Sequence, residues 1–232
     1  MTNEEQYWAD KAALLDPDCY VKVTGTDWQR TVPQGKVWYL VSAWQNRYVD
    51  TNFKWHHRNM DEPLMLPPGF TLRVSDYDTG TAYYADPSIV QATDSRYQTD
   101  PKGLYFERIN RLRTIPFEYV GCHIPVNSLP GVAPKRNMPF PTDCERILLR
   151  HIDCHDGCWL ILYNGVGSAM NTQNEVDDIR PVRFTKSMMV PIRRSDYPSI
   201  YLGHGNAQNN PAGVQTYNGW GTAQFQRLPA DW

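Results

Sequence analysis

The sequence lacks an excess of charge of either sign, and it lacks long apolar segments. Its 23 basic and 25 acidic side chains leave a formal net charge of −2. There is no basic surplus to neutralise phosphates, so we expect no nucleic-acid partner. A membrane helix needs roughly 18 apolar residues, whereas the longest apolar run here is Trp159 to Tyr163. We therefore expect no membrane span.

Signals for export are also missing. The chain begins Met-Thr-Asn-Glu-Glu, without the basic region and apolar run of a secretory signal. It has no Asn-x-Ser/Thr acceptor for glycosylation. The odd, scattered set of five cysteines predicts reduced thiols rather than a disulfide framework. Together these absences favour synthesis in a cytoplasm.

Recognisable catalytic motifs are absent as well. There is no Gly-x-Ser-x-Gly elbow and no phosphate-binding loop. Gly165-Val-Gly167 follows an expected strand, but it lacks the third glycine of a dinucleotide site and no helical pattern follows it. The glutamates show no paired spacing of the kind a glycoside hydrolase needs. We therefore expect a protein that is not an enzyme and that carries no cofactor.

Aromatic residues are plentiful in the sequence. The 14 Tyr, 8 Trp and 7 Phe suit the pleated, half-buried surface of a sheet, while 18 Pro and 15 Gly favour many turns. One helix is expected at residues 3–16, with Asn3 as its cap, acids in its first turn and Asp16-Pro17 as its stop. We expect residues 1–19 to form an N-terminal helix or arm that covers a sheet edge or docks on a neighbouring chain.

Two Pro-x-Gly turns each precede a strand pattern. Pro33-Gln-Gly35 leads into residues 36–44, and Pro67-Pro-Gly69 leads into residues 70–74. The first strand has apolar residues on both faces and is expected to be covered on both sides or to lie in an interface. One face carries Val37, Tyr39, Val41 and Ala43, and the other carries Trp38, Leu40 and Trp44.

A hairpin is predicted at residues 146–163, because Asp156-Gly157 separates two runs rich in β-formers. Further strands are expected at residues 20–23, 182–192, 199–202 and 222–228. Residues 75–145 are the least regular part, with short strands expected at 83–84, 104–106 and 117–120. The fold class is thus all-β: a two-sheet antiparallel sandwich, jelly-roll-like, with a short N-terminal helix and long ordered loops. The sandwich domain spans residues 20–232, with residues 75–145 as a loop-rich insertion.

Residues 55–69 resemble the first metal-binding motif of cupins, which are small β-barrels. His57, Glu62 and Gly69 keep the spacing of that motif, but Trp55 occupies the position of its first histidine. Two ligands do not make a stable divalent site, so His57 and Glu62 are weak candidate ligands and no metal is expected. A second cluster, His151 with Cys154 and Cys158, lacks the distant ligand pair of a zinc site.

Residues 30–75, and more weakly the 146–163 segment, resemble the jelly-roll-type β-sandwich proteins of tailed-phage virions. These include capsid decoration or cement proteins and related head or tail components. The resemblance implies a non-enzymatic structural protein in a virion, bound to the major capsid protein or to tail components and forming a homo-oligomer, with a trimer favoured. The candidate interface residues are Tyr7, Trp8, Leu14, Leu15 and Trp44, since aromatic rings bury large areas at contacts.

Two other functions stay open at this point. One is a cupin-like metal-binding barrel that uses His57 and Glu62. The other is a carbohydrate-binding module for host attachment, in which exposed rings such as Trp44, Trp55 or Trp220 stack on sugars.

Overall fold

The structure is a computed structural model of the 232-residue chain. It describes residues 1–24, 29–43, 47–49, 52, 55–57, 63–73, 81–123, 127–128, 135–154, 158–163, 182–184, 189–196, 199–204, 215–216 and 219–232. Within these residues the fold is mostly β, with antiparallel sheets and a few helices. None of the described helices is long and apolar enough to cross a membrane.

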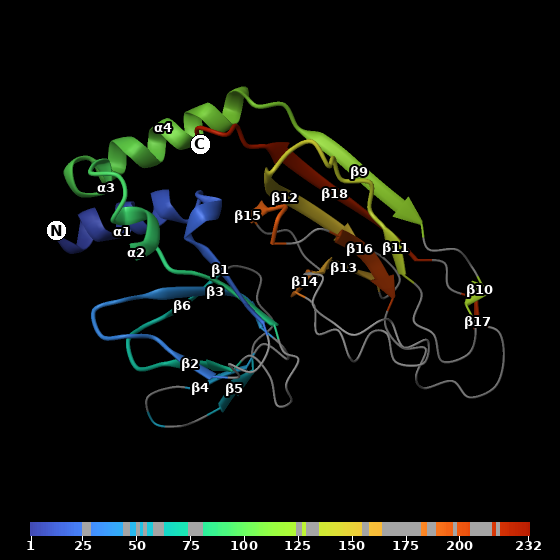
Figure 1. Ribbon diagram of the computed structural model, residues 1–232, viewed down its shortest axis with the longest axis horizontal. Helices are drawn as coiled ribbons and strands as arrows, with labels where there is room; N and C mark the ends of the chain where they lie inside the picture. The colour runs from blue at the N-terminus through green and yellow to red at the C-terminus, as the bar shows by residue number, and fades with distance from the viewer. Residues whose placement is uncertain are drawn as a thin grey trace.

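Four four-stranded sheets and one two-stranded sheet are described, and all their pairings are antiparallel (Figure 1). The first sheet, in spatial order, is β1 (Tyr20–Thr24), β8 (Thr81–Ala85), β3 (Trp38–Ala43) and β6 (Leu64–Leu66). The second is β2 (Gln29–Thr31), β7 (Thr71–Arg73), β4 (Arg47–Val49) and β5 (Trp55–His57). The third is β15 (Val190–Arg193), β12 (Arg146–Cys154), β18 (Trp220–Arg227) and β9 (Glu118–His123). The fourth is β11 (Lys135–Asn137), β16 (Ser199–His204), β13 (Cys158–Tyr163) and β14 (Val182–Phe184), and β10 (Asn127–Ser128) pairs with β17 (Gln215–Thr216).

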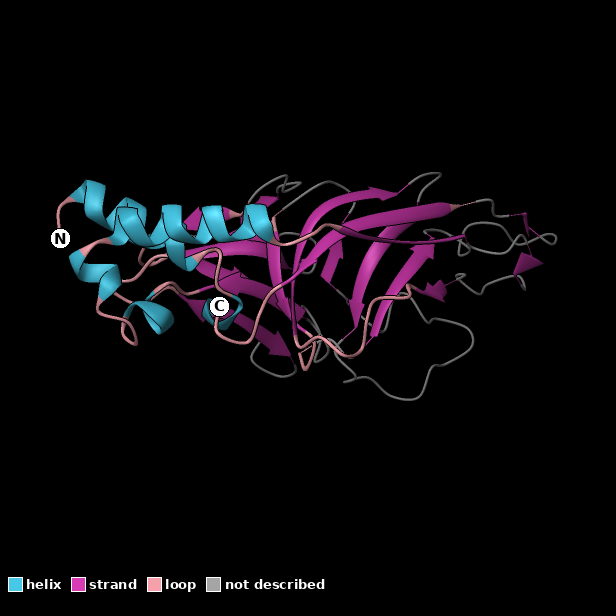
Figure 2. Cartoon of the chain, turned by 90° about the horizontal axis from the view of Figure 1, so that it is seen from above, coloured by secondary structure: helices cyan, strands magenta, loops and turns pink. Residues whose placement is uncertain are grey.

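The pairing divides the strands at the middle of the chain. Strands β1 to β8 pair only with one another in the described residues, and β9 to β18 do the same. The helices α2 (Ser88–Gln91), α3 (Arg96–Thr99) and α4 (Pro101–Thr114) connect the two sets. They gather with α1 (Asn3–Ala13) and the short 3₁₀ helix η1 (Pro17–Cys19) at one end of the molecule (Figure 2).

Strand β3 is covered on both faces, as its sequence pattern predicted. Trp38 and Leu40 pack in a cluster with Leu66 and Leu72. Val41 belongs to the main core, and Tyr39 packs against it. A strand buried on both sides carries apolar residues at successive positions, because neither face meets water.

The main core joins the two sets of strands. Tyr20 and Tyr83 stack with ring centroids 5.1 Å apart, in the same cluster as Ile147, Leu149 and Phe225 of the third sheet. The hydroxyl of Tyr20 donates to the carbonyl of Leu14 at 2.9 Å, and the hydroxyl of Tyr83 donates to that of Pro191 at 2.8 Å. The buried rings therefore keep their polar ends satisfied.

Helix α4 covers the outer face of the third sheet. Leu112 of α4 packs with Leu148 of β12 and with Leu15 and Leu228. The amide of Gln226, a fully buried residue, donates to the carbonyls of Leu112 and Ile115 at 2.7 and 2.8 Å. The carbonyl of Leu112 also accepts the N–H of Ile115, the C-cap of α4, at 3.2 Å. The carbonyls at a helix end lack the usual partner one turn further on, and Gln226 fastens this end of α4 to β18.

The predicted hairpin is wrong in its pairing, although both of its strands form at the expected residues. β12 pairs with β15 and β18, whereas β13 pairs with β14 and β16. The chain crosses from one sheet to another between Cys154 and Cys158, and the Asp-Gly turn itself lies outside the described residues. An Asp-Gly dipeptide predicts a change of direction, but tertiary partners decided which strands pair.

The expected strand at residues 104–106 is also wrong, because these residues lie inside α4. The carboxylate of Asp100 accepts the N–H of Gly103 at 3.0 Å and Pro101 occupies the first turn, so the Asp-Pro pair starts a helix here. The other two strands expected in this region do form. β8 includes residues 83–84, and β9 begins at Glu118, one residue after the expected start.

The N-terminal helix forms where the sequence predicted it, with shifted ends. Its cap is Thr2 rather than Asn3, in a capping box with Glu5, and its last residue is Ala13. Ala9, Ala12 and Ala13 are fully buried in the main core.

A buried ion pair holds the helices together. Arg108 of α4 donates to the carboxylate of Asp16 at 2.8 Å, to the carbonyl of Ala12 at 2.7 Å and to the hydroxyl of Tyr97 at 2.7 Å. The side chains of Arg108 and Asp16 are only 9% and 8% exposed. Asp16 also accepts the N–H of Asp18 and so caps η1. One guanidinium thus links α4, α3, the end of α1 and the start of η1.

We expect Arg108→Met to destabilise the fold by about 3–5 kcal/mol, because the substitution leaves the carboxylate of Asp16 buried without its cation. Urea unfolding followed by circular dichroism measures the loss. The control is Arg111→Met. Arg111 lies on the same helix as Arg108, but its ion pair with Asp231 is exposed, so this variant should lose far less stability. Equal midpoints for the two variants would contradict this role of Arg108.

Candidate protein-binding surface

Four aromatic side chains meet on the outer side of α1 and α4, and we call them the aromatic patch. They are Tyr7 and Trp8 of α1 and Tyr105 and Phe106 of α4. The ring of Trp8 lies 5.2 Å from that of Tyr7, 5.4 Å from that of Tyr105 and 5.5 Å from that of Phe106. Tyr7 is 52% exposed and Phe106 is 45% exposed, so the rings pack on one another and still present apolar area to the outside.

The patch is held in place from below. Trp8 precedes the buried Ala9, and Tyr105 packs against both the main core and the leucine cluster under α4. On another face of α1, the carboxylate of buried Asp10 accepts hydrogen bonds from the side-chain amides of Gln6 and Gln91 at 2.8 Å each and from the hydroxyl of Tyr39 at 2.9 Å. Burial and this carboxylate raise the pKa of Tyr39, so its hydroxyl stays a proton donor.

Charged side chains surround the patch. The ammonium of Lys11 lies 5.6 Å from the centre of the Tyr7 ring, and that of Lys102 lies 5.4 Å from the centre of the Trp8 ring. The indole N–H of Trp8 donates to the carboxylate of Glu4 at 3.4 Å. An apolar centre with a polar, solvated rim is typical of a protein contact surface.

The five predicted interface residues have different locations. Tyr7 and Trp8 lie in the patch. Leu15 is buried under α4, and Leu14 packs against the main core, so both side chains serve the interior of this chain. Trp44 lies outside the described residues. Tyr105 and Phe106 were missed because the sequence reading gave them to a strand.

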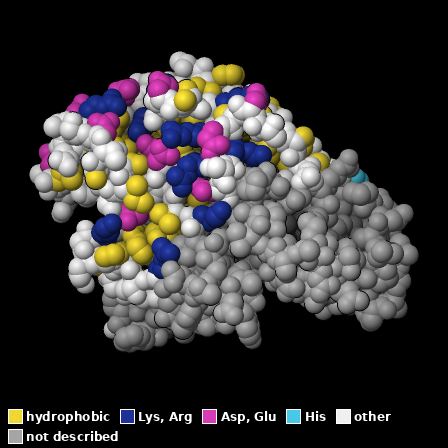
Figure 3. All heavy atoms as spheres, in the orientation of Figure 1, with side chains coloured by type: hydrophobic (Ala, Val, Ile, Leu, Met, Phe, Trp, Pro, Cys, Tyr) yellow, Lys and Arg dark blue, Asp and Glu magenta, His cyan; other side chains and the backbone are white. Residues whose placement is uncertain are grey.

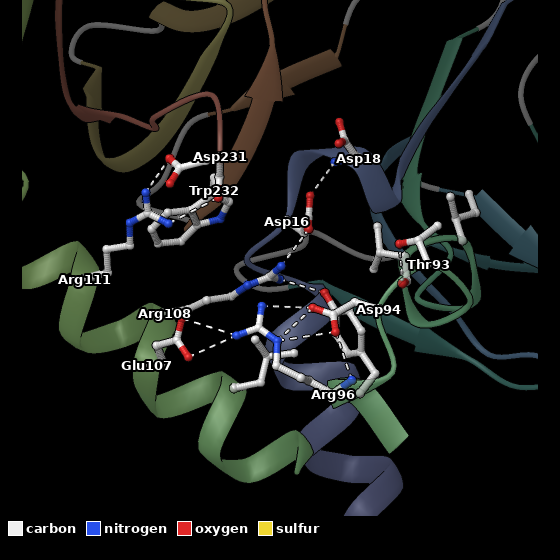
Figure 4. Close-up of a pocket in the computed structure, with 14 residues that line it drawn as sticks. Asp16, Asp18, Thr93, Asp94, Arg96, Glu107, Arg108, Arg111, Asp231 and Trp232 are labelled. Atoms are coloured by element: carbon white, nitrogen blue, oxygen red, sulfur yellow. Dashed lines mark hydrogen bonds and ion pairs between the residues drawn. The ribbon is translucent and has the colours of Figure 1, made fainter. Parts of the chain in front are cut away.

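A cleft of about 280 Å³ lies among the helices (Figure 4). It is bordered by α2, α3, α4, η1 and the C-terminal residues. Its charged lining residues are Asp16, Asp18, Asp94, Arg96, Glu107, Arg108, Arg111 and Asp231. Figure 3 shows basic and acidic side chains interspersed over the helical end of the molecule.

Each arginine of the cleft is paired with a carboxylate. Arg96 lies between Asp94 and Glu107, with nitrogen–oxygen distances of 2.9 and 3.1 Å. Arg108 binds Asp16, and Arg111 binds Asp231 beside the ring of Trp232 (Figure 4). Their charges are thus compensated within the protein, and the ion pairs of the cleft connect different segments of the chain.

The candidate metal ligands lie only partly within the described residues. The backbone of His57 lies in β5, opposite Arg47 of β4, and Glu62 lies outside the described residues. The residues that the structure describes contain no group of three His, Cys, Asp or Glu side chains that could hold a metal ion. Cys154 of the second cluster is the last residue of β12 and is half-buried.

The described residues include the Cys19 thiol and one of the three sugar-stacking candidates, Trp220. Burial raises the pKa of the Cys19 thiol, and this group donates to the carbonyl of Ala13; a neutral buried thiol is a poor nucleophile. Trp220 begins β18 and is 38% exposed. For the other two sugar-stacking candidates, the Trp55 side chain and Trp44 lie outside what is described.

Comparison with known proteins identifies no family. No family model and no curated protein matches the chain. Among solved structures it is similar to a conserved protein of unknown function from Pseudomonas aeruginosa, with 8% identity over 90% of this chain and 80% of that one, and a TM-score of 0.22. It is also similar to a guanosine-bound regulatory subunit of a cAMP-independent protein kinase A from Trypanosoma cruzi, with 10% identity, 98% and 83% coverage and a TM-score of 0.18. At such TM-scores, neither likeness bears on function.

We expect Arg96→Gln to raise the pKa of Asp94, because hydrogen bonds from the Arg96 side chain hold that pKa below its ordinary value. A lowered pKa stabilises the folded state above the unfolded pKa of about 3.9, and this stabilisation is lost as the pH falls through the folded value. Carboxyl carbon NMR titration measures the shift. The control is Arg113→Gln, in the last turn of α4. An unchanged titration of Asp94 in the Arg96→Gln variant would rule out the pairing of Arg96 with Asp94.

Proposed function

We propose that this chain is a non-enzymatic structural protein of a virus particle that binds neighbouring particle proteins through the aromatic patch. The exposed patch is the observation that carries the proposal. A soluble protein usually buries such rings, and when it exposes several together they mark a contact surface. Tyrosine and tryptophan are also the residues that most often dominate binding energy at interfaces.

The setting in a virion rests on the sequence. The segments that resemble phage decoration proteins include β3 and β7, together with the Pro-x-Gly turns before them. We further propose that the sheets pair as sandwiches of the jelly-roll type. The cluster of Trp38, Leu40 and Leu72 between the first two sheets supports this pairing, as does the main core between the first and third sheets.

The partners proposed are the major capsid protein or tail components, together with further copies of this chain. A preformed patch suits such a role, since rings already packed together lose little conformational freedom on binding. The cleft is a weaker candidate for the functional surface, because each of its arginines is already satisfied within the chain.

We expect the double variant Tyr7→Ser/Phe106→Ser to lower the amount of chain in assembled particles at least tenfold, because it removes the two exposed rings of the patch. Quantitative mass spectrometry of gradient-purified particles, from the source that carries the gene, measures the ratio of this chain to the major capsid protein. Circular dichroism checks that the variant is folded.

The matched control is Met65→Ser/Tyr119→Ser, which removes two side chains that are 56% and 71% exposed outside α1 and α4. This control should be incorporated like the unmodified chain. Absence of the unmodified chain from purified particles would refute the role in the virion. Normal incorporation of the patch variant would refute the role of the patch.

A further inference from the structure

The exposed face of α1 carries opposite charges at its two ends. Glu4, Tyr7, Trp8 and Lys11 follow one another at the spacing that places residues on one side of a helix. Glu4, Tyr7 and Lys11 are exposed, and Trp8 is half-buried. The opposite side of α1 packs into the core through Ala9, Ala12 and Ala13.

These charges are symmetric about the aromatic rings. Glu4 and Lys11 are seven positions apart, or about 10 Å along a helix, and their midpoint falls between Tyr7 and Trp8. If a second α1 lies antiparallel across this face, a two-fold axis passes through that midpoint. Glu4 of each copy then faces Lys11 of the other, and the rings of both copies meet between the two ion pairs. The face is therefore complementary to itself, as a two-fold contact requires.

We propose that the partner of the aromatic patch is a second copy of this chain, bound through an antiparallel α1–α1 contact centred on Tyr7 and Trp8. This inference rests on the proposed function and specifies one of its partners. An isologous contact joins chains in pairs, so it favours a dimer over the trimer that the sequence resemblance implies.

The groups already near these charges do not prevent the contact. Lys102 lies 3.9 Å from Glu4, and their side chains are 57% and 74% exposed; such a pair is weak. Lys11 lies over the Tyr7 ring, where a carboxylate from the second copy can reach it. The helix has 11 residues and is roughly 16 Å long, so the contact is small for a protein interface and its Kd should lie in the micromolar range.

Charge reversal followed by charge exchange tests the proposal. Glu4→Lys alone and Lys11→Glu alone place like charges opposite each other in the dimer, so each should raise the dimer Kd at least tenfold in sedimentation equilibrium. The double variant Glu4→Lys/Lys11→Glu restores opposite charges across the axis and should return the Kd to within about threefold of the original. Both reversals weaken the favourable helix-dipole interactions of α1, so a loss of helix stability would be largest in the double variant. Recovery of the dimer there cannot arise from folding.

Arg113→Glu reverses a basic residue in the last turn of α4, as Lys11→Glu does in α1. It is the matched control and should leave the Kd unchanged. A monomeric unmodified chain at high micromolar concentration would overturn the self-contact. So would a double variant that dimerises no better than the single ones. Neither result bears on the proposed function, which is tested by the entry of the Tyr7→Ser/Phe106→Ser variant into particles. If that variant enters particles normally, the proposed role of the patch is refuted whatever the dimer Kd.

Discussion

The buried guanidinium of Arg108 is the interaction on which the helical end of this molecule depends. Its three hydrogen bonds reach the last turn of α1, the hydroxyl of Tyr97 and the carboxylate that caps η1. β1 begins directly after η1, so the same cation also sets where the first strand enters the core. Burying a charge is costly unless it is paired and its hydrogen bonds are satisfied, and here both conditions are met. A cation at the C-terminal end of α1 is also favoured by the helix dipole.

The position of the aromatic patch follows from this constraint. Arg108 fixes α1 against α4, and the two helices contribute two rings each to the patch. Gln226 fastens the C-terminal end of α4 to the third sheet, so α4 is held at its middle by Arg108 and at its C-terminal end by Gln226. The rings are thus exposed on a support that is itself buried. A surface held in this way keeps its shape without a partner, which reduces the entropy lost on binding.

The sequence predicted the features that depend on local pattern. The continuous apolar run of β3 correctly indicated burial on both faces, and the N-terminal acids correctly indicated α1. It failed where distant residues decide the outcome. β12 and β13 have the composition of a hairpin, yet each found a better partner far along the chain. Asp100-Pro101 served equally well as a turn or as the start of a helix, and Gly103 weakened the helical pattern of α4. For that reason the sequence did not place Tyr105 and Phe106 in the patch. No sequence signal marked Arg108 as buried, since its partners lie 11 to 96 residues away.

The two groups of charged residues at the helical end have different physical roles. In the cleft, each arginine faces a carboxylate of the same chain, so its charge is already compensated and a ligand would have to displace an existing partner. On α1, Glu4 and Lys11 stand too far apart along the helix to neutralise each other and flank exposed rings instead. Opposite charges that cannot meet within one chain can meet between two chains. The internal contacts of Glu4 that compete with this are exposed: the pair with Lys102 at 3.9 Å and the long hydrogen bond from the indole of Trp8 at 3.4 Å. For this reason the outer face of α1, rather than the cleft, is the part of the described surface best suited to bind another protein.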